Sequence, residues 1–218
     1  RNKEPEVGNF GLFLCNWGMR SKSLAAGQRA RVMDQQLLKN PCSVLVVIEA
    51  NDGLVNLLSA STSVEGTQGS GLAGRPEFDY MVMRGQEEAS IRIAARADNC
   101  ASLECLHFES HADIAIRFAP SLARSRLMVC KVTFKQNIGH LGNEIVIAGV
   151  HGSRRTMNLQ WQEAHKAFFD RLHAQILSSK IQFLCGDFNM SLTDVPKQLA
   201  RRGLKCDCVA WYPWKPRG

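Results

Sequence analysis

The chain has 218 residues, of which 45% are hydrophobic and 22% are charged, and its formal net charge is +7. This length suffices for one substantial hydrophobic core or two small ones. No linker-like break divides the sequence, so we expect a single domain over residues 1–218. No apolar run approaches the roughly 20 residues that a membrane-spanning helix needs, which excludes that class of protein. The first residues do not resemble a signal peptide.

Eight cysteines are far below the density of a disulfide-stabilised scaffold. Four of them lie in or beside apolar runs, where a thiol behaves as a small hydrophobic side chain: Cys15, Cys42, Cys130 and Cys185. The spacings of Cys100 with Cys105 and of Cys206 with Cys208 do not fit a zinc site, so strand or surface positions are the better interpretation. These features favour a reducing compartment, and we expect an intracellular protein of the cytoplasm or nucleus.

The hydrophobic pattern predicts two helices and a series of short strands. The first helix covers residues 24–39 with Ser23 as its N-cap, and the second covers residues 159–177 with an apolar stripe along one face. The predicted strands, in chain order, cover residues 13–16, 43–48, 80–84, 90–95, 103–108, 114–118, 127–134, 145–151 and 181–185. Several of them alternate apolar and polar side chains, as sheets packed on one face do. We therefore expect an α/β protein in which a two-sheet sandwich is flanked by helices.

The most informative stretch is Gly186-Asp187-Phe188-Asn189, which follows an apolar run. Side chains two positions apart lie on the same side of a strand, so Asp187 and Asn189 are expected to lie together. A carboxylate beside an amide suits a hard cation such as Mg²⁺ and a phosphate oxygen bound to it. Taken alone, Gly-Asp-x-Asn is also a common turn at a strand end, where these residues are favoured for conformational reasons.

Three further predicted strands end in a polar residue of the kind that metal or phosphate chemistry uses. Glu49 closes a continuous apolar run, and a carboxylate there costs free energy unless a metal ion, or an Arg or Lys side chain, compensates its charge. Asn16 and His151 end two other strands. A single histidine at a strand end is more often a hydrogen-bonded structural residue, but four such strand ends together favour a functional site.

Taken in chain order, these four motifs resemble the pattern of the endonuclease/exonuclease/phosphatase superfamily, which has the deoxyribonuclease I-like fold. The residues that carry the resemblance are Asn16, Glu49, His151 and Gly186-Asp187-Phe188-Asn189. It covers about residues 10–212 and implies a two-sheet α/β sandwich. It also implies closing strands with an Asp and an Asp-His pair, which have no counterpart before Gly218. We therefore expect the chain to be truncated at both ends, with terminal strands missing, and to be part of a longer polypeptide.

The resemblance implies hydrolysis of a phosphate ester with Mg²⁺ as the cofactor and Mn²⁺ as the alternative ion. Glu49 would bind the metal, and Asn16 would orient Glu49 or contact the metal's water shell. Asp187 and Asn189 would position the attacking water and the phosphate. His151 would donate to a phosphoryl oxygen or protonate the leaving group. Because the general base that completes this set is the absent histidine, the isolated chain is expected to be nearly inactive.

The Arg154-Arg155 pair closely follows His151, within reach of a phosphate at the strand ends. A guanidinium group contacts two phosphate oxygens at once, whereas the alternative is a solvated pair of loop residues. Together with the net charge of +7, this favours nucleic acid, DNA or RNA, as the partner and nuclease activity as the function. Three alternatives remain: a catalytically inactive nucleic-acid-binding module of the same fold, a phosphatase or lipid phosphodiesterase of the same superfamily, and a truncated product that does not fold stably.

Overall fold

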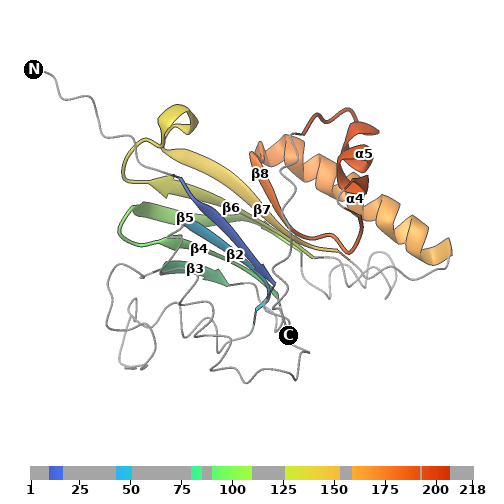
Figure 1. The fold of residues 1–218 in the computed structure, drawn as a ribbon, viewed down its shortest axis with the longest axis horizontal. Coiled ribbons are helices and arrows are strands. Elements are labelled where there is room, and N and C mark those ends of the chain that lie inside the picture. Colours follow the sequence, from blue (N-terminus) through green and yellow to red (C-terminus); the bar gives the residue numbers. More distant parts are fainter. Residues whose placement is uncertain are drawn as a thin grey trace, which may run out of the picture.

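A computed structural model of the chain describes residues 10–16, 43–50, 80–84, 90–109, 126–152, 159–191 and 193–206. The elements, in chain order, are β1 (Leu12–Asn16), β2 (Val44–Ala50), β3 (Tyr80–Arg84), β4 (Ser90–Arg96), β5 (Cys100–Phe108), β6 (Arg126–Phe134), the 3₁₀ turn η3 (Gly139–Leu141), β7 (Glu144–His151), α4 (Leu159–Ser179), β8 (Phe183–Asp187) and α5 (Asp194–Ala200) (Figure 1). The predicted helix over residues 24–39 and the predicted strand over residues 114–118 lie outside the described residues. Neither described α-helix is long and apolar enough to cross a membrane.

The eight described strands form two four-stranded sheets. The first sheet has the order β1-β2-β4-β3, and the second has the order β5-β6-β7-β8. Each sheet combines one parallel pair, β1 with β2 or β7 with β8, with antiparallel pairs. The helices α4 and α5 lie on the side of the second sheet that faces away from the first (Figure 1). This architecture confirms the predicted two-sheet α/β sandwich with flanking helices.

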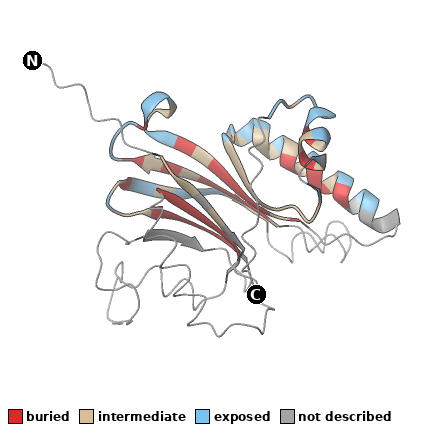
Figure 2. Cartoon of the chain, viewed as in Figure 1, coloured by how far each residue is buried: buried red, intermediate tan, exposed pale blue. Residues whose placement is uncertain are grey.

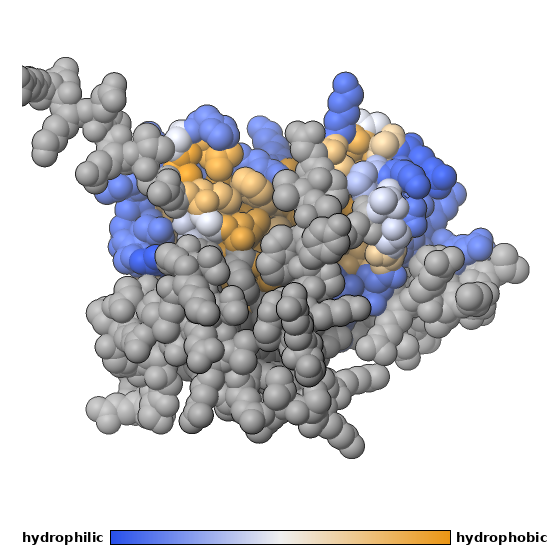
Figure 3. Space-filling view, viewed as in Figure 1, coloured by the Kyte–Doolittle hydropathy of each residue, from blue (hydrophilic) through white to orange (hydrophobic). Residues whose placement is uncertain are grey.

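The main hydrophobic core lies between the two sheets. Alternate residues of β2, β4, β6 and β7 build it, and Figure 2 shows buried positions along these strands. Hydrophobic side chains are visible over the sheets in the space-filling view, with hydrophilic ones at their rim (Figure 3). The rings of Phe10, just before β1, and Phe183, at the start of β8, are 5.2 Å apart. Strands β1 and β8 of the two sheets therefore begin at the same end of the sandwich.

The two sheets approach each other closely at Gly149 of β7. A Cβ atom at this position would lie 2.5 Å from Cγ2 of Ile91 in β4 and 3.3 Å from Cγ1 of Val46 in β2. Both of these side chains are fully buried. Because the shorter distance is far below a van der Waals contact between carbon atoms, the absence of a side chain at Gly149 permits this spacing of the sheets.

A second hydrophobic cluster joins the helices to the second sheet. Phe168, Phe169 and Leu172 of α4 and Val195 and Leu199 of α5 are all buried. They pack against the outward-facing residues of β6 and β7, which are Leu127, Val129, Ala148 and Val150. The apolar stripe predicted for the second helix is thereby confirmed at Phe168 and Leu172, and the helix extends to Ser179.

An ion pair connects α4 to the end of β5. Nε of Arg171 lies 3.2 Å from Oε2 of Glu109, and the two side chains are only 19% and 12% exposed. Nε2 of His107 lies 3.5 Å from Oε1 of the same carboxylate. Burial raises the pKa of Glu109, but the hydrogen bond with His107 and the charge of Arg171 outweigh burial, and the pKa is lowered overall. Glu109 is therefore ionised at neutral pH and holds the helix layer to the edge of the sheet.

Most predicted strand bounds differ from the observed ones by one to three residues, and two of the differences have a clear cause in strand pairing. The strand predicted over residues 181–185 is found at Phe183–Asp187, because its last residues pair with the end of β7. The strand predicted over residues 103–108 begins earlier, at Cys100, which pairs with Phe134 of β6. In both cases a partner strand distant in sequence extends the ladder, and the local hydrophobic pattern contains no information about that partner.

We predict that Gly149→Ala destabilises the fold by about 1–3 kcal/mol, because the added methyl group overfills the space between the sheets. Urea-induced unfolding measures the loss. Ile91→Ala alone costs about 2–5 kcal/mol because it leaves a cavity. The double variant should be more stable than the sum of the two losses implies, since the new methyl group occupies that cavity. Strictly additive losses would contradict the close approach of the two sheets at this point.

We predict that Glu109→Gln lowers the free energy of unfolding by about 1–3 kcal/mol at pH 7, since it removes a charged partner of Arg171. The folded-state pKa of Glu109 is lowered, so its stabilising contribution is present above the unfolded-state pKa of about 4.3 and is lost as the pH falls through the folded-state value. The difference between wild type and variant should therefore shrink below about pH 4.

Glu104→Gln is the matched control for this comparison. Glu104 lies on β5, which ends just before Glu109, and pairs with Lys131 at 3.0 Å, but its side chain is 57% exposed. Exposed pairs contribute only about 0–1 kcal/mol. Equal losses in the two variants, or a difference for Glu109→Gln that grows in acid, would contradict the structural role of Glu109.

Candidate active site

The ends of β7 and β8 bring two predicted site residues side by side. The parallel register pairs His151, the last residue of β7, with Asp187, the last residue of β8. Ile147 and Cys185 of the same strands face the core between the sheets. Because side chains alternate along a strand, His151 and Asp187 belong to the same face, at the carboxyl end of the sandwich. Both residues are partly buried.

Two hydrogen bonds tie the end of β8 and the segment after it to the residue that follows β7, and a third lies within that segment. The backbone N–H of Asn189 donates to Oδ1 of Asp187 at 2.9 Å, and Nδ2 of Asn189 donates to the carbonyl oxygen of Gly152 at 2.7 Å. The N–H of Gly152 in turn donates to the carbonyl oxygen of Asp187 at 2.7 Å. Asn189 has a φ of +50°, a left-handed conformation that asparagine tolerates better than most residues. Gly186-Asp187-Phe188-Asn189 therefore forms a turn, and this turn leaves Asp187 at the strand end where a metal or phosphate site is predicted.

Gly186 allows β8 to reach this position. A Cβ atom on Gly186 would lie 2.0 Å from the carbonyl oxygen of Val150 in β7. The obstructing atom belongs to the backbone and cannot rotate away as a side chain would. The glycine of the Gly-Asp-x-Asn motif is therefore required by the close contact with β7, and this contact brings Asp187 alongside His151.

Asn16 and Glu49 lie at the end of the first sheet. The parallel register pairs Asn16, the last residue of β1, with Ile48 of β2, so Glu49 follows directly. The pairing of β2 with β4 shifts between Val47 and Ala50, an irregularity of the kind that redirects side chains at sheet ends. Strands β1, β2, β7 and β8 all run toward the lower side of the view (Figure 1). The backbone thus brings the four predicted strand ends to one end of the sandwich.

The described part of the site contains oxygen donors suited to a hard cation. The Asp187 carboxylate lies at the strand ends, and Mg²⁺ is typically bound through one or two carboxylates with several retained waters. Among the side chains that the structure describes, no three His, Cys, Asp or Glu residues form a metal-binding group. The side chains of Asn16 and Glu49 lie outside the described part, as do Arg154 and Arg155. Their assignment as metal and phosphate contacts stays a prediction.

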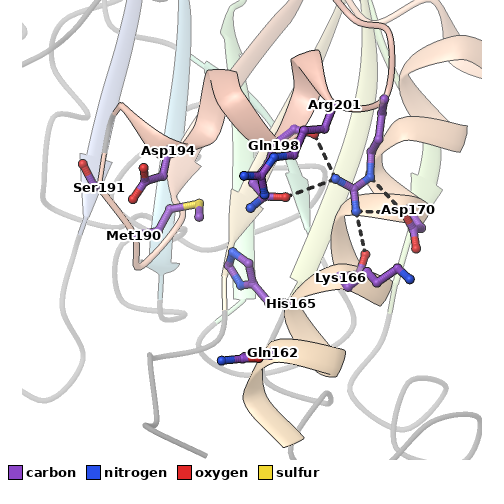
Figure 4. Close-up of a pocket in the computed structure, with 10 residues that line it drawn as sticks. Gln162, His165, Lys166, Asp170, Met190, Ser191, Asp194, Gln198 and Arg201 are labelled. Carbon is purple, nitrogen blue, oxygen red and sulfur yellow. Dashed lines mark hydrogen bonds and ion pairs between the residues drawn. The ribbon is translucent and has the colours of Figure 1, made fainter. Parts of the chain in front are cut away.

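A neighbouring pocket of about 640 Å³, which no sequence motif predicted, opens between α4 and α5. Met190 and Ser191, directly after the Asn189 turn, form one side of it (Figure 4). The other lining residues are Gln162, His165, Lys166 and Asp170 of α4 and Asp194, Gln198, Arg201 and Arg202 of α5 and the turn that follows it. The sequence signal is the spacing of three to four positions between the polar residues on α4, which places them on one helix face.

Arg202 fixes the wall of this pocket. Its Nε donates to Oδ1 of Asp170 at 2.8 Å, and its Nη1 donates to the carbonyl oxygen of Gln198 at 2.9 Å. His165 beside it is only 6% exposed. Burial first, and then the charge of Arg202, lower the pKa of His165, so its imidazole is neutral at pH 7. The helix layer beside the strand ends is therefore held together by a defined polar network.

The sheet topology is that of a two-sheet α/β sandwich, and its likeness to solved structures shows that the fold is the deoxyribonuclease I-like one of endonuclease/exonuclease/phosphatase proteins. Solved structures of that class match the chain over most of its length. No protein-family model and no curated protein sequence matches it. The resemblance inferred from the strand-end motifs is thus confirmed at the level of the fold.

Three solved structures illustrate the likeness. TDP2 of D. rerio, in complex with a single-strand DNA product, matches with a TM-score of 0.56 and 15% identity over 89% of this chain. The catalytic domain of human Nocturnin with a bound sulfate anion matches with a TM-score of 0.53 and 13% identity, over 90% of this chain and 71% of its own. An endonuclease/exonuclease/phosphatase family protein from Bacteroides thetaiotaomicron matches with a TM-score of 0.53 and 12% identity, over 92% of this chain and 70% of its own. The chain spans 64% of the length of the TDP2 chain.

We predict that Asn189→Ala destabilises the protein by about 1–2 kcal/mol, because it removes the hydrogen bond to Gly152 and puts a Cβ-bearing residue without a polar side chain at positive φ. Asn189→Gly loses the same hydrogen bond but tolerates the backbone conformation, so it should cost less. Chemical denaturation of the two variants tests this order. A glycine variant less stable than the alanine variant would contradict the left-handed conformation at this position.

Proposed function

We propose that this chain is a Mg²⁺-dependent phosphodiesterase that hydrolyses phosphodiester bonds of nucleic acid. The observation that carries the proposal is the parallel pairing of β7 with β8, in which His151 is the partner of Asp187 and Asn189 is tied to the end of β7. An imidazole, a carboxylate and an amide at adjacent strand ends supply the proton transfer and the positioning that hydrolysis of a phosphate ester requires. The deoxyribonuclease I-like fold supports the same assignment by analogy.

In this proposal Glu49, with Asn16 beside it, would hold the Mg²⁺ ion at the neighbouring ends of β1 and β2. The register of β1 with β2 supports the assignment, because Asn16 is the partner of the residue just before Glu49. One carboxylate is sufficient to anchor an ion that keeps most of its waters. When held there, the ion would supply positive charge that offsets charge on the phosphate and on the leaving oxygen.

The residues at the ends of β7 and β8 would carry the other steps. Asp187 orients the attacking water while its Oδ1 accepts the N–H of Asn189, which fixes the carboxylate plane. One amide hydrogen of Asn189 is donated to the carbonyl oxygen of Gly152. The second amide hydrogen would be donated to a phosphoryl oxygen of the substrate. His151 donates to a phosphoryl oxygen or protonates the leaving group.

Charge supports nucleic acid as the substrate. The net charge of +7 favours a polyanion, and the exposed Lys166 and Arg201 add positive charge at the pocket beside the Asn189 turn. The predicted phosphate contacts Arg154 and Arg155 follow β7 in the sequence. The DNA product bound to TDP2 of D. rerio is in line with this substrate class.

We predict that cleavage of a supercoiled plasmid or a labelled RNA, slow in the isolated chain because the general-base histidine is absent, depends on Mg²⁺, is lost in EDTA and falls at least about 10²-fold in Asp187→Asn. This substitution keeps an oxygen that accepts the Asn189 N–H and removes only the charge. Asp194→Asn is the matched control, because it removes a carboxylate from the start of α5, in the pocket and outside the strand ends. Its cleavage rate should equal that of wild type.

A folded wild-type chain that binds nucleic acid but cuts neither substrate would contradict the proposal for the chain in isolation. The same assay is then repeated on a chain extended by the downstream coding sequence. Recovered cleavage would support the predicted need for a further Asp-His pair. Continued inactivity would favour the alternative of a nucleic-acid-binding module. In either form, Glu49→Gln should abolish the rise in thermal midpoint that Mg²⁺ causes in wild type.

A further inference from the structure

Two cysteines lie opposite each other on β5 and β6. The antiparallel register pairs Cys105 with Cys130, two positions from the pair Leu103 and Val132. Leu103, Val132 and Cys130 contribute to the core between the sheets, so the cysteine pair belongs to the same face. Among the described strands β5 is an edge strand, and Cys105 is exposed there while Cys130 is fully buried.

The register places the two cysteines directly opposite each other, so the Cys130 thiol can donate a hydrogen bond to an ionised Cys105 sulfur. This hydrogen bond first, and contacts with His107 after it, outweigh the effect of burial and together lower the pKa of Cys105 to about 7. The same hydrogen bond, together with burial, raises the pKa of Cys130. At neutral pH the pair therefore consists of one accessible sulfur with strong thiolate character and one buried, protonated thiol.

The strand pairing meets the distance requirement of a disulfide bond. Bridged cysteines have Cα atoms about 4.4–6.8 Å apart, and directly opposite residues of antiparallel strands are about 4.5 or 5.5 Å apart. The register of β5 also shifts on both sides of Cys105, between Cys100 and Ser102 and between Cys105 and His107. An edge strand with such irregularities can adjust its backbone more easily than a regular ladder in the middle of a sheet.

We propose that Cys105 and Cys130 form a reversible cross-strand disulfide, in which Cys105 is the attacking thiolate, Cys130 is the resolving thiol and low-molecular-weight disulfides are the oxidant. The Cys105 thiolate attacks one sulfur of the small disulfide, forms a mixed disulfide and releases one small thiolate, which takes up a proton. Cys130 then loses its proton and attacks the Cys105 sulfur, releasing the second small thiol. Two protein thiols are oxidised and one small disulfide is reduced to two thiols.

The other described cysteines do not share these properties. Cys100 is buried, its pKa is raised by burial, and its partner in the register is Phe134. Burial raises the pKa of Cys185 to about 12, and its partner in the register is Gly149. Among the cysteines of the described strands, Cys105 is therefore the one that is both exposed and directly opposite another cysteine, Cys130. The exposed Cys206 is outside both sheets and provides an internal control.

The proposal is tested by incubating the chain with oxidised glutathione and mapping the cysteines by mass spectrometry without reductant. Digestion with trypsin and a Glu-specific protease separates Cys105 from Cys100, because Glu104 lies between them. We expect a peptide pair linked through Cys105 and Cys130 as the main product, and its loss on addition of dithiothreitol. Cys206→Ser should leave this linked product unchanged.

Two variants distinguish the roles of the two thiols. In Cys130→Ala, Cys105 should accumulate as the mixed disulfide with glutathione. The pH at which its alkylation by iodoacetamide is half-maximal should rise from about 7 toward about 8.5. Because that change leaves a small cavity in the core, Cys105→Ser at the exposed position serves as an independent variant. It should fold normally by circular dichroism and give no linked product.

Either of two results would overturn the proposal. The first is a wild-type chain in which Cys105 stays in the mixed disulfide or links to Cys100 or Cys206 instead of Cys130. The second is an alkylation midpoint near 8.5 in wild type, which would remove the role of Cys130 as hydrogen-bond donor.

Discussion

The parallel pairing of β7 with β8 is the constraint on which the rest of the described structure depends. Its register makes His151 and Asp187 neighbours, and it continues past the strands through the hydrogen bonds of Gly152 and Asn189. The same register directs alternate residues of both strands to the inter-sheet core and to the helix layer. A shift by one residue would exchange the two faces, so the candidate site and both hydrophobic clusters depend on a single alignment.

Polar contacts have a different role from the hydrophobic clusters. The pair of Glu109 with Arg171 joins α4 to the residue that follows β5, and the pair of Asp170 with Arg202 joins α4 to the turn that follows α5. Glu109, Arg171 and Arg202 are mostly buried, and each lies within hydrogen-bonding distance of an opposite charge. A buried charge without such a partner would destabilise the fold. These contacts hold the helix layer against the second sheet, beside the strand ends where polar residues replace apolar ones. A rigid scaffold of this kind can position side chains for catalysis on the segments that leave the strands.

The sequence predicted the strands, the long helix and the strand-end position of His151, because each depends on residues close together in the chain. It did not reveal that Glu109 meets Arg171, or that Cys105 lies opposite Cys130. Hydrophobic alternation reports which face of a strand is buried but not which residue of another strand lies beside it. The assignments of other site residues, such as Glu49, rest on the resemblance and on backbone register and stay predictions.

The sequence by itself determined the local elements: the apolar runs that become strands, the stripe on α4 and the turn-forming preference of Asn189. Only the tertiary structure decided that Asp187 closes β8 beside β7 and that Cys105 is exposed on an edge strand while Cys130 is buried. The reason is the range over which each effect acts. Backbone propensity and side-chain periodicity operate over a few residues, whereas strand register and burial are set by packing between segments distant in sequence.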